Sequence, residues 1–264
     1  MRELVKIGIG YRRPLDNWIS EHKTSIDCLE VTAEHFFEQG HDRLEQLSKT
    51  FPIYVHGLGL SLGTPGPLEA EALEKFSKVS NAANATWISE HIAFTRTSVV
   101  DLGYLNAIPL TEEYLNVMVE HALAVSNHCK RPIILENITS HMAPPGNMRE
   151  TEFINRLCQS ANAGLLLDAT NLFINSKNHN FRALEWLHEI NPEFITQLHA
   201  VGYGFKDGLY CDSHSLPIQD EILDLIGAIL DYSNVKAIIL ERDDRFGETD
   251  EVNEDLRKLR TLIQ

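Results

Sequence analysis

Six short apolar runs in this chain each end in a histidine or a carboxylate, and this pattern restricts the fold more than any other feature. The residues at these ends are His56, His91, Glu136, Asp168, His199 and Glu241. Such runs are typical of buried strands in a parallel sheet. A polar group placed repeatedly where a strand ends predicts a barrel enzyme, because the carboxyl ends of all barrel strands meet at one active-site face.

The order of the segments agrees with a barrel. Apolar runs that suit buried strands begin at Leu4, Ile26, Phe51, Thr86, Arg131, Gly164, Phe194 and Val235. Apolar residues at three- and four-residue spacing predict helices over 67–82, 111–127, 150–159, 181–189, 219–230 and 251–263. Turn segments are predicted at 143–147 and 202–208. Strands that alternate with helices in this way predict the α/β class, with one TIM (β/α)8 barrel of the xylose-isomerase-like type as a single catalytic domain over residues 1–264.

Composition excludes several classes of function. The formal net charge of -15 disfavours a nucleic acid or an anionic membrane as partner, because binding to phosphates depends on Lys and Arg. The N-terminal sequence lacks the features of a signal peptide, and no apolar run reaches the roughly 20 residues of a membrane-spanning helix. We therefore expect a cytoplasmic protein. The four cysteines form no CxxC pair and are expected to be ordinary packing residues; they are Cys28, Cys129, Cys158 and Cys211.

Individually, the polar strand ends are weak signals. His56 is followed by Gly57, Gly59 and Gly63, whose missing side chains would let the backbone approach a ligand closely. A histidine at a strand end is nevertheless more often hydrogen-bonded structure than a metal ligand. A metal site becomes the better interpretation when several such groups lie together in one barrel mouth. Their charges would be costly to bury without a cation.

Two further pairs add candidate ligands. Asp168 and Asn171 are three residues apart, so both oxygens could face one cation, or Asn171 could cap the next helix. Asp212 and His214 have alternate-residue spacing, which points both side chains the same way in an extended strand. After Glu241, the residues 242–244 (Arg-Asp-Asp) are interpreted as a solvated charged loop.

The number of donors predicts more than one metal ion. Nine nitrogen and oxygen donors exceed what a single four- to six-coordinate ion requires; they are His56, His91, Glu136, Asp168, Asn171, His199, Asp212, His214 and Glu241. Two or three ions that share bridging carboxylates would use them all. A mixture of imidazole and carboxylate without thiolate suits iron, manganese or zinc, and ligand type alone does not choose among these metals.

An ordered set of motifs over nearly the whole chain resembles the multinuclear non-heme iron-dependent oxidative enzymes. The motifs are HGLGLSLG, SEHIAFT, ILENITS, LLLDATN, LHAVGYG, DSHSLPI and LERDD. The resemblance implies a TIM barrel with two or three iron ions, in mixed Fe(II) and Fe(III) states, that uses dioxygen to modify cysteines of a ribosomally made precursor peptide. It also implies that the nine donors are the iron ligands, and that His199, Asp212 and His214 take part in catalysis.

Two differences from the motifs of many family members indicate which branch of the family this chain resembles. Many members have a second histidine after the one that matches His199, whereas this chain has Tyr203, which is similar to the methanobactin-forming branch. That branch converts cysteine to an oxazolone with a neighbouring thioamide and works with a smaller partner protein. Where many members have ENY, this chain has Glu34, His35 and Phe36, and the roles of His35 and of Glu30 and Glu34 stay open.

The same residues also fit other functions. The product could be that of another cysteine-modifying peptide oxidase of the same family. A divalent-metal sugar isomerase or a phosphodiesterase-type hydrolase could use the same donors on the same barrel without oxygen. Net charge disfavours a nuclease. A metal-storage or peptide-carrier protein is the non-enzymatic alternative.

Overall fold

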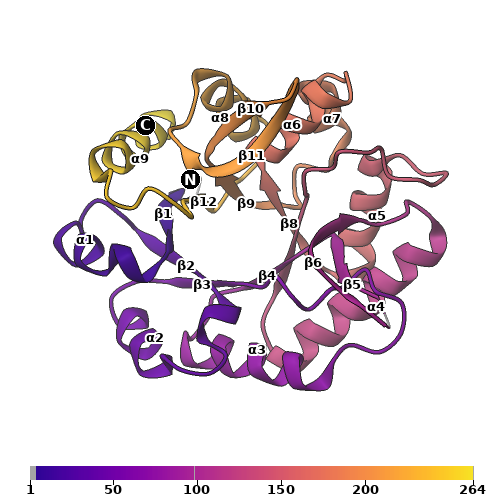
Figure 1. Ribbon diagram of the computed structural model, residues 1–264, viewed down its shortest axis with the longest axis horizontal. Helices are drawn as coiled ribbons and strands as arrows, with labels where there is room; N and C mark the ends of the chain where they lie inside the picture. The colour runs from indigo at the N-terminus through magenta and orange to yellow at the C-terminus, as the bar shows by residue number, and fades with distance from the viewer. Residues whose placement is uncertain (1–3, 98, 264) are drawn as a thin grey trace.

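The core of the protein is a closed barrel of eight parallel strands (Figure 1), as seen in a computed structural model that describes residues 4–97 and 99–263. Around the barrel the strands follow the order β1-β12-β9-β8-β7-β4-β3-β2. The bounds of the barrel strands are β1 Lys6–Tyr11, β2 Cys28–Thr32, β3 Ile53–His56, β4 Ile88–His91, β7 Ile133–Glu136, β8 Gly164–Asp168, β9 Ile195–Ala200 and β12 Ala237–Leu240. The predicted TIM barrel is therefore confirmed.

Helices surround the barrel and connect its strands. Their bounds are α1 Asp16–Glu21, α2 His41–Ser48, α3 Ala70–Ala82, α4 Glu112–Cys129, α5 Glu150–Ala161, α6 Ala169–Asn178, α7 Ala183–Glu189, α8 Asp220–Tyr232 and α9 Thr249–Leu262, with short 3-10 turns at Arg13–Leu15 and Ala33–Phe36. Six of these correspond to the six predicted helices. No helix within the described ranges combines the length and apolar character that a bilayer crossing requires.

Three helices were not predicted from the spacing of apolar residues in the sequence. Two of them, α1 and α2, are short, with six and eight residues. The third, α6, starts directly after β8 and is buried on nearly every side; its polar residues include Asn171 and Asn175, which are buried, so no charged face marks a solvent-exposed side. Its N-cap is Asp168, whose Oδ1 accepts the backbone N–H of Asn171 at 2.7 Å. The idea that Asn171 caps this helix is thus wrong, because Asn171 lies inside the first turn.

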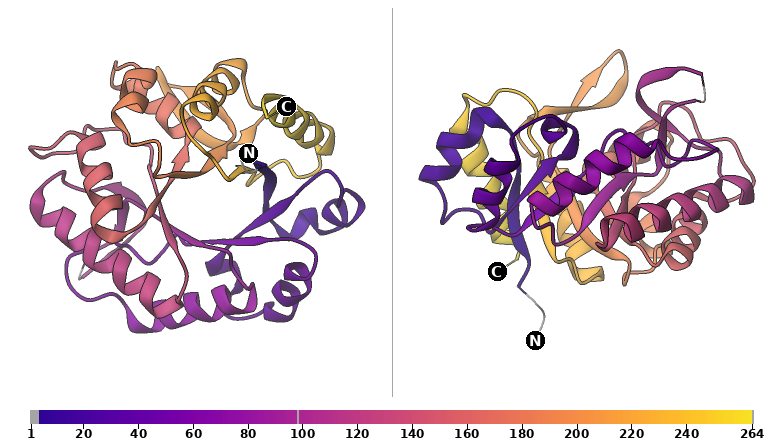
Figure 2. Two further views of the ribbon diagram at one scale, coloured as in Figure 1. Left: turned by 180° about the vertical axis from the view of Figure 1, so that it is seen from behind. Right: turned by 90° about the horizontal axis from the view of Figure 1, so that it is seen from below.

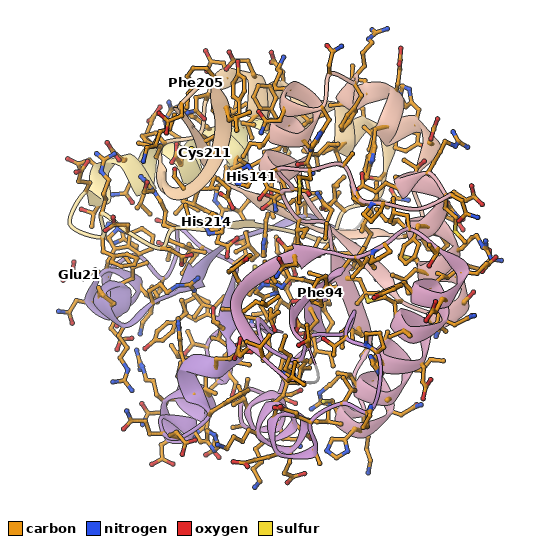
Figure 3. All side chains as sticks on the ribbon, turned by 45° about the vertical axis from the view of Figure 1, so that its right-hand side comes forward. Glu21, Phe94, His141, Phe205, Cys211 and His214 are labelled. Atoms are coloured by element: carbon orange, nitrogen blue, oxygen red, sulfur yellow. The ribbon has the colours of Figure 1, made fainter. Side chains whose placement is uncertain are left out.

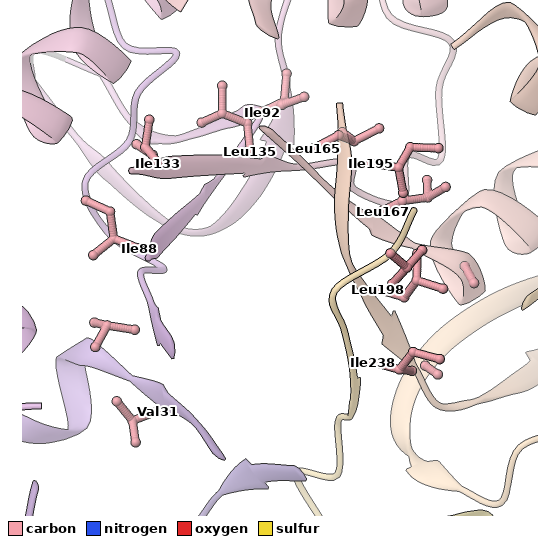
Figure 4. Packing of buried hydrophobic residues seen from close by; sticks show 14 of the residues in the cluster. Val31, Ile88, Ile92, Ile133, Leu135, Leu165, Leu167, Ile195, Leu198 and Ile238 are labelled. Carbon is pink, nitrogen blue, oxygen red and sulfur yellow. The ribbon is translucent and has the colours of Figure 1, made fainter. Parts of the chain in front are cut away.

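The two faces of each barrel strand contact different parts of the protein. Side chains on the outer face are apolar and pack against the helices, as Val31, Ile88, Leu135 and Leu198 do in Figure 4. The alternate residues point into the barrel, where a lower apolar layer lies beneath the polar strand ends. That layer consists of Cys28, Tyr54, Trp87, Ile134, Leu166, Ala237 and Ile239. Buried strands that look uniformly apolar in sequence therefore still place one polar residue in the barrel mouth.

Two antiparallel hairpins project from the same end of the barrel (Figure 2, right). The first pairs β5 (Ala93–Arg96) with β6 (Asp101–Ala107), and the second pairs β10 (Gly202–Lys206) with β11 (Leu209–Leu216). The predicted turn segment at 202–208 is mostly strand, with the turn confined to Asp207 and Gly208, which have φ angles of 53° and 84°. The segment at 143–147 contains no helix or strand, as predicted.

All four cysteines are free, and Cys28, Cys129 and Cys158 are buried. Burial raises the pKa of Cys28 and that of Cys158 to about 12, so these thiols stay protonated. Cys211 on β11 is half-buried.

Candidate metal centre

The carboxyl ends of the barrel strands bring most of the predicted ligands into one buried group. His56 ends β3, His91 ends β4, Glu136 ends β7 and Asp168 ends β8. His199 lies on β9, next to Asp168 in the register between β8 and β9. Glu241 directly follows β12. Each of these six side chains is at most 6% exposed, so none is a surface group that faces the mouth by chance.

The first cluster consists of His56, His91 and Glu136. The Nε2 atoms of both histidines lie 3.4 Å from Oε2 of Glu136. Two ligand atoms bound about 2.1 Å from one tetrahedral ion would be about 3.4 Å apart. The other nitrogen of each ring is occupied, since Nδ1 of His56 contacts Ser89 Oγ at 2.9 Å and Nδ1 of His91 contacts the Gly57 carbonyl at 3.2 Å. Both rings are therefore held with Nε2 directed at the carboxylate.

The second cluster joins Glu136 to Asp168, His199 and Glu241. Nδ1 of His199 lies 3.2 Å from Oε1 of Glu136 and 3.0 Å from Oε2 of Glu241. Nε2 of the same ring contacts Oε1 of Glu30 at 2.6 Å. Glu136 thus contributes one oxygen to each of the first two clusters, which is the arrangement of a bridging carboxylate.

The third cluster consists of His214, Glu241 and Asp243. Nδ1 of His214 lies 3.6 Å from Oε1 of Glu241 and 2.9 Å from Oδ2 of Asp243. Asp212 contacts the other ring nitrogen of His214, with Oδ2 at 2.7 Å from Nε2. Glu241 therefore joins the second and third clusters in the same way that Glu136 joins the first and second.

The solvated loop predicted for residues 242–244 is only partly correct. Arg242 is 1% exposed; its side chain donates to the Ser215 carbonyl and lies 3.0 Å from Glu251. Asp243 contacts His214, and only Asp244 is an exposed residue without a role in the clusters. The sequence suggested a charged surface loop because it did not show that β11 and α9 pack over this segment.

Several oxygen atoms in this group are buried and make no hydrogen bond with the described residues. They are Glu136 Oε2, Asp168 Oδ2, Asn171 Oδ1 and Asp212 Oδ1. A buried acceptor without a partner costs roughly 1–3 kcal/mol, and such atoms are rare in native proteins. Four of them at one strand-end face fit an environment that cations complete. Asn171 belongs to this set because its Nδ2 donates to the Asn137 carbonyl at 3.1 Å, which leaves Oδ1 directed elsewhere.

The electrostatics of the group agree with a cation site. Burial alone would raise the pKa of Glu136, but the three histidines around it outweigh burial and lower the pKa to about 2. Burial would lower the pKa of His91, yet Glu136 and Glu90 raise it to about 9. Burial and the Glu136 charge raise the pKa of Asp168 well above its usual value. The group therefore contains carboxylates that protons or metal ions must neutralise.

A cavity of about 830 Å³ opens above the clusters at the hairpin end of the barrel. Its wall includes Glu136, Asn171, Asp212, His214 and Glu241. The remaining wall is largely apolar and aromatic, with two arginines at its edge; it includes Tyr11, Phe36, Leu58, Ile138 and Phe246 together with Arg12, Arg13 and His35. Figure 3 shows His214 near the mouth, below Cys211 and Phe205 on the β10–β11 hairpin.

Three residues near the clusters have roles that were not predicted from the sequence; they are Glu30, Glu34 and Gln197. Glu30 is a buried residue of β2 whose carboxylate contacts His199 and accepts from Gln197 Nε2 at 2.5 Å. Glu34 accepts from the backbone N–H groups of Leu58 and Gly59 and so anchors the loop after β3. The inward position of Glu30 in a buried strand was the available signal, since an unpaired charge would not be buried there.

The glycines after His56 lie in a closely packed loop. A Cβ on Gly57 would lie 2.8 Å from Phe76, and one on Gly63 would lie 2.3 Å from Ile108 and 2.8 Å from the Ala93 carbonyl. These glycines therefore permit close packing of the loop against other parts of the protein. A Cβ on Gly59 would lie 3.3 Å from Glu34 Oε1, and one on Gly57 would also lie 3.4 Å from Cδ of Glu90.

Comparisons with known proteins support an enzyme of peptide modification. The family model described as "RiPP precursor modification enzyme MbnB/TglH/ChrH" matches residues 6–264, where RiPP denotes a ribosomally made and post-translationally modified peptide. A UPF0276 protein of Shewanella sediminis is 32% identical over 257 residues, which cover 96% of this chain and 92% of the relative.

Solved structures with a similar fold have low sequence identity to this chain. D-psicose 3-epimerase from Clostridium cellulolyticum H10 has a TM-score of 0.65 at 12% identity, with 98% of this chain and 100% of that chain covered. A xylose isomerase domain protein from Planctomyces limnophilus has a TM-score of 0.62 at 12% identity, with 99% and 98% covered. At such identities the likeness shows the fold alone, and it confirms the xylose-isomerase-like type of barrel.

Proposed function

The chain belongs to the MbnB/TglH/ChrH family of RiPP precursor modification enzymes, and from this premise we propose that it oxidises cysteine residues of its precursor peptide with dioxygen at two or three iron ions. The observation that carries the proposal is the fusion of three ligand clusters through Glu136 and Glu241 at the floor of the 830 Å³ cavity. Two shared carboxylates between three clusters favour a multinuclear centre over a single ion.

The proposed ligands follow the clusters. His56 and His91 would hold the first ion, His199 and Asp168 the second, and His214 the third, with Glu136 and Glu241 shared. Asn171 and Asp212 join them because each directs a buried oxygen without a hydrogen bond into the described group. Asp243, which the sequence analysis set aside, is a further candidate because it lies within the third cluster.

The donor set is of a type that suits iron. Imidazole and carboxylate without thiolate are common ligands of iron, manganese and zinc. Iron in mixed ferrous and ferric states would supply, together with dioxygen, the oxidation chemistry that imidazole and carboxylate side chains lack. The family resemblance favours iron among these metals.

The cavity walls would position the peptide for this reaction. The volume of about 830 Å³ accommodates a cysteine together with neighbouring residues of a peptide, and the apolar wall would exclude water around it. Asp212 and Asp243 contact the two ring nitrogens of His214 and so fix its orientation at the wall. His214 and Asp212 line the cavity beside the cysteine, where as ligands they would place the bound ion against the thiol. His199, which is fully buried, would act as a ligand held by Glu30.

The methanobactin-type product, an oxazolone with a neighbouring thioamide, is the proposed outcome. Tyr203 supports it, since this residue replaces the additional histidine of many relatives. Tyr203 stacks on Phe173 with ring centroids 4.9 Å apart and packs near Tyr210, so it fills a structural role on the hairpin.

A smaller partner protein is part of the same proposal. Exposed apolar side chains are concentrated on the two hairpins and the nearby loop, next to the cavity; they include Val99, Tyr104, Met142, Phe205 and Leu209. Such a concentration beside an active-site mouth is typical of interaction surfaces. A partner bound there would reach the peptide that enters the cavity.

The direct test combines metal analysis with peptide mass. Protein from iron-supplemented cells would be examined by Mössbauer spectroscopy and then incubated in air with each cysteine-containing short peptide that the surrounding genome region encodes. We expect two or three irons per chain and a mass change that requires dioxygen. Glu136→Gln should remove iron and the mass change, whereas Glu150→Gln, a carboxylate bonded to Trp186 outside the clusters, should change neither.

Other results would favour a different class of protein. Zinc or manganese at full occupancy, with no oxygen-dependent change in peptide mass, would contradict the oxidase proposal. Activity on a free sugar or a phosphodiester with those metals would then favour the isomerase or hydrolase. Bound metal that is released without any turnover would indicate a storage or carrier protein.

A further inference from the structure

A column of buried, hydrogen-bonded side chains runs down the barrel axis from the metal clusters. Nε2 of His199 contacts Oε1 of Glu30 at 2.6 Å, and Oε2 of Glu30 accepts from Nε2 of Gln197 at 2.5 Å. Oε1 of Gln197 accepts from Nε1 of Trp87 at 2.7 Å. These residues are between 0% and 8% exposed, so the chain of contacts is enclosed by protein.

The column ends in a pair of stacked aromatic rings. The rings of Trp87 and Tyr54 are 3.9 Å apart between centroids and 7° from parallel. Both residues belong to the lower inward layer of the barrel. Packing alone would be satisfied by small and aliphatic side chains, which with Cys28 fill the rest of that layer, so the aromatic pair and its polar connection need a further reason.

The aromatic pair also lines a second cavity at the opposite end of the barrel. This cavity of about 410 Å³ includes Tyr54, Trp87, Lys6 and Lys236. It lies at the amino ends of the strands, where β1 begins on the side away from the two hairpins (Figure 2, right). Neither lysine forms an ion pair within the described ranges, although the whole chain carries a formal charge of -15. A cationic cavity in an acidic protein attracts small anions.

We propose that this lower cavity is the binding site of an anionic one-electron donor, and that Trp87, Gln197 and Glu30 form the route by which its electron reaches the iron centre. The inference rests on the proposed function, because it requires iron in the clusters. The donor loses one electron and one Fe(III) becomes Fe(II), and no bond is formed or broken. The continuous series of hydrogen-bonded contacts provides the path of the electron. The protein that encloses these contacts excludes water from the path.

A separate route has a structural reason. The upper cavity is the one through which the peptide must reach the metal clusters, so a bound peptide would block a reductant from the same side. The lower cavity stays open to solvent whether or not the peptide is bound. The centre could therefore be returned to its ferrous state without release of the peptide.

The test follows reduction of the iron rather than turnover. Protein loaded with iron and oxidised to Fe(III) would be mixed anaerobically with ascorbate, an anionic one-electron donor, and the loss of the ferric signal followed by stopped-flow absorbance and freeze-quench EPR. Rates would be expressed per bound iron. Trp87→Leu should slow reduction about tenfold or more, whereas Trp186→Leu, a tryptophan bonded to Glu150 outside the barrel, should not slow it.

Charge reversal distinguishes the two ends of the barrel. The double substitution Lys6→Glu and Lys236→Glu should slow reduction by ascorbate severalfold, and the loss should shrink at high salt. Arg13→Glu at the edge of the upper cavity should have little effect. Wild-type protein with the peptide bound should keep its reduction rate.

The opposite results would overturn the inference. Equal rates per bound iron in the Trp87 and lysine variants would mean that the column only holds His199 in place. A loss confined to Arg13→Glu would place the donor in the upper cavity. Protein that binds no iron would overturn the proposed function and this inference together, whereas iron-dependent peptide oxidation with unchanged reduction rates would overturn this inference alone.

Discussion

At the scale of single residues, the candidate centre depends on contacts behind its ligands. Glu30 accepts Nε2–H of His199 and thereby leaves Nδ1 of that ring for the clusters, where Glu136 and Glu241 lie. A histidine whose second nitrogen is held by a carboxylate has a fixed tautomer and a fixed orientation. The role of Glu30 therefore differs from that of a strand-end surface residue, although Glu30 itself need not touch a metal.

Glu30→Gln tests this role. The substitution keeps the size of the side chain but removes the carboxylate that holds the ring, so the affinity for Fe(II) should fall roughly 10- to 100-fold. Anaerobic titration with Fe(II) measures the effect, and Glu45→Gln on the exposed side of α2 serves as control. Unchanged affinity in Glu30→Gln would show that His199 is held by the barrel alone or is not a ligand.

Asp255 gives a pH dependence that is separate from the metal clusters. It is fully buried on α9, and burial raises its pKa to about 6, while its Oδ1 accepts the backbone N–H of Ile218 at 3.1 Å. The ordinary pKa of an unfolded Asp is about 3.9. Between these values the folded state retains a proton that the unfolded state has lost, so the free energy of unfolding should fall as pH rises, by at most about 1.4 kcal/mol per pH unit.

Urea unfolding at several pH values between 4 and 7 measures this contribution. Asp255→Asn keeps the acceptor for Ile218 but cannot ionise, so the decrease with pH should be smaller in the variant than in the wild type. Equal slopes in the two proteins would contradict the assignment of this pH dependence to Asp255.

At the scale of elements, the barrel depends on where its strands approach each other closely. β1 places Gly8 inward, opposite Cys28 on β2. A Cβ on Gly8 would lie 2.5 Å from Cys28 Sγ, 2.6 Å from the Cys28 carbonyl oxygen and 2.9 Å from Ile239. Because one of these neighbours is backbone, the strand pair itself would have to move.

Gly8→Ala should therefore destabilise the protein by about 1–3 kcal/mol, the usual cost of overpacking a core. Gly227→Ala on α8 is the matched control, because an added Cβ there has no neighbour within 4 Å and alanine favours helix by up to about 1 kcal/mol. Urea denaturation would compare both variants with the wild type. A Gly8→Ala protein as stable as the wild type would show that β1 and β2 can separate at no cost.

At the scale of the whole molecule, the closed barrel turns separate strand ends into one charged group. Carboxylates from β7, β8 and the segment after β12 meet within the same interior, and Oε2 of Glu136 and Oδ2 of Asp168 have no hydrogen bond with the described residues. Burial of such charge opposes folding unless protons or cations compensate it. Metal binding should therefore stabilise the entire protein.

Removal of metal tests this expectation. At a free metal concentration 100-fold above Kd, binding at one site stabilises the folded state by about 2.7 kcal/mol, which corresponds to a Tm increase of roughly 5–10 °C for a chain of this size. Thermal unfolding of Fe(II)-loaded protein and of protein treated with a chelator would measure the shift. Glu136→Gln should show a much smaller shift, and identical Tm values for loaded and chelated wild type would contradict a buried metal centre.

The fold and the membership of the family were accessible from the sequence for specific reasons. The alternation of apolar runs and amphipathic stretches reflects burial that acts locally along the chain, so it predicted the barrel, six helices and the strand ends that carry His56, His91, Glu136, Asp168 and His199. The helix α6 was missed because its polar residues are buried and no charged face marks a solvent-exposed side. The β10–β11 hairpin was missed because its glycines resemble a turn.

The sequence by itself determined the barrel and which strands end in a metal-binding type of residue, because strand periodicity fixes the face on which each side chain lies. Only the tertiary structure decided which clusters are joined by a shared carboxylate. It also decided that Asp243 contacts His214 and that Arg242 is buried. The contacts by which Glu30, Gln197 and Trp87 connect the clusters to the opposite end of the barrel likewise depend on the tertiary structure. These relations join residues up to 169 positions apart. Closure of the barrel brings them together, and distances across a closed barrel are not encoded in any local pattern.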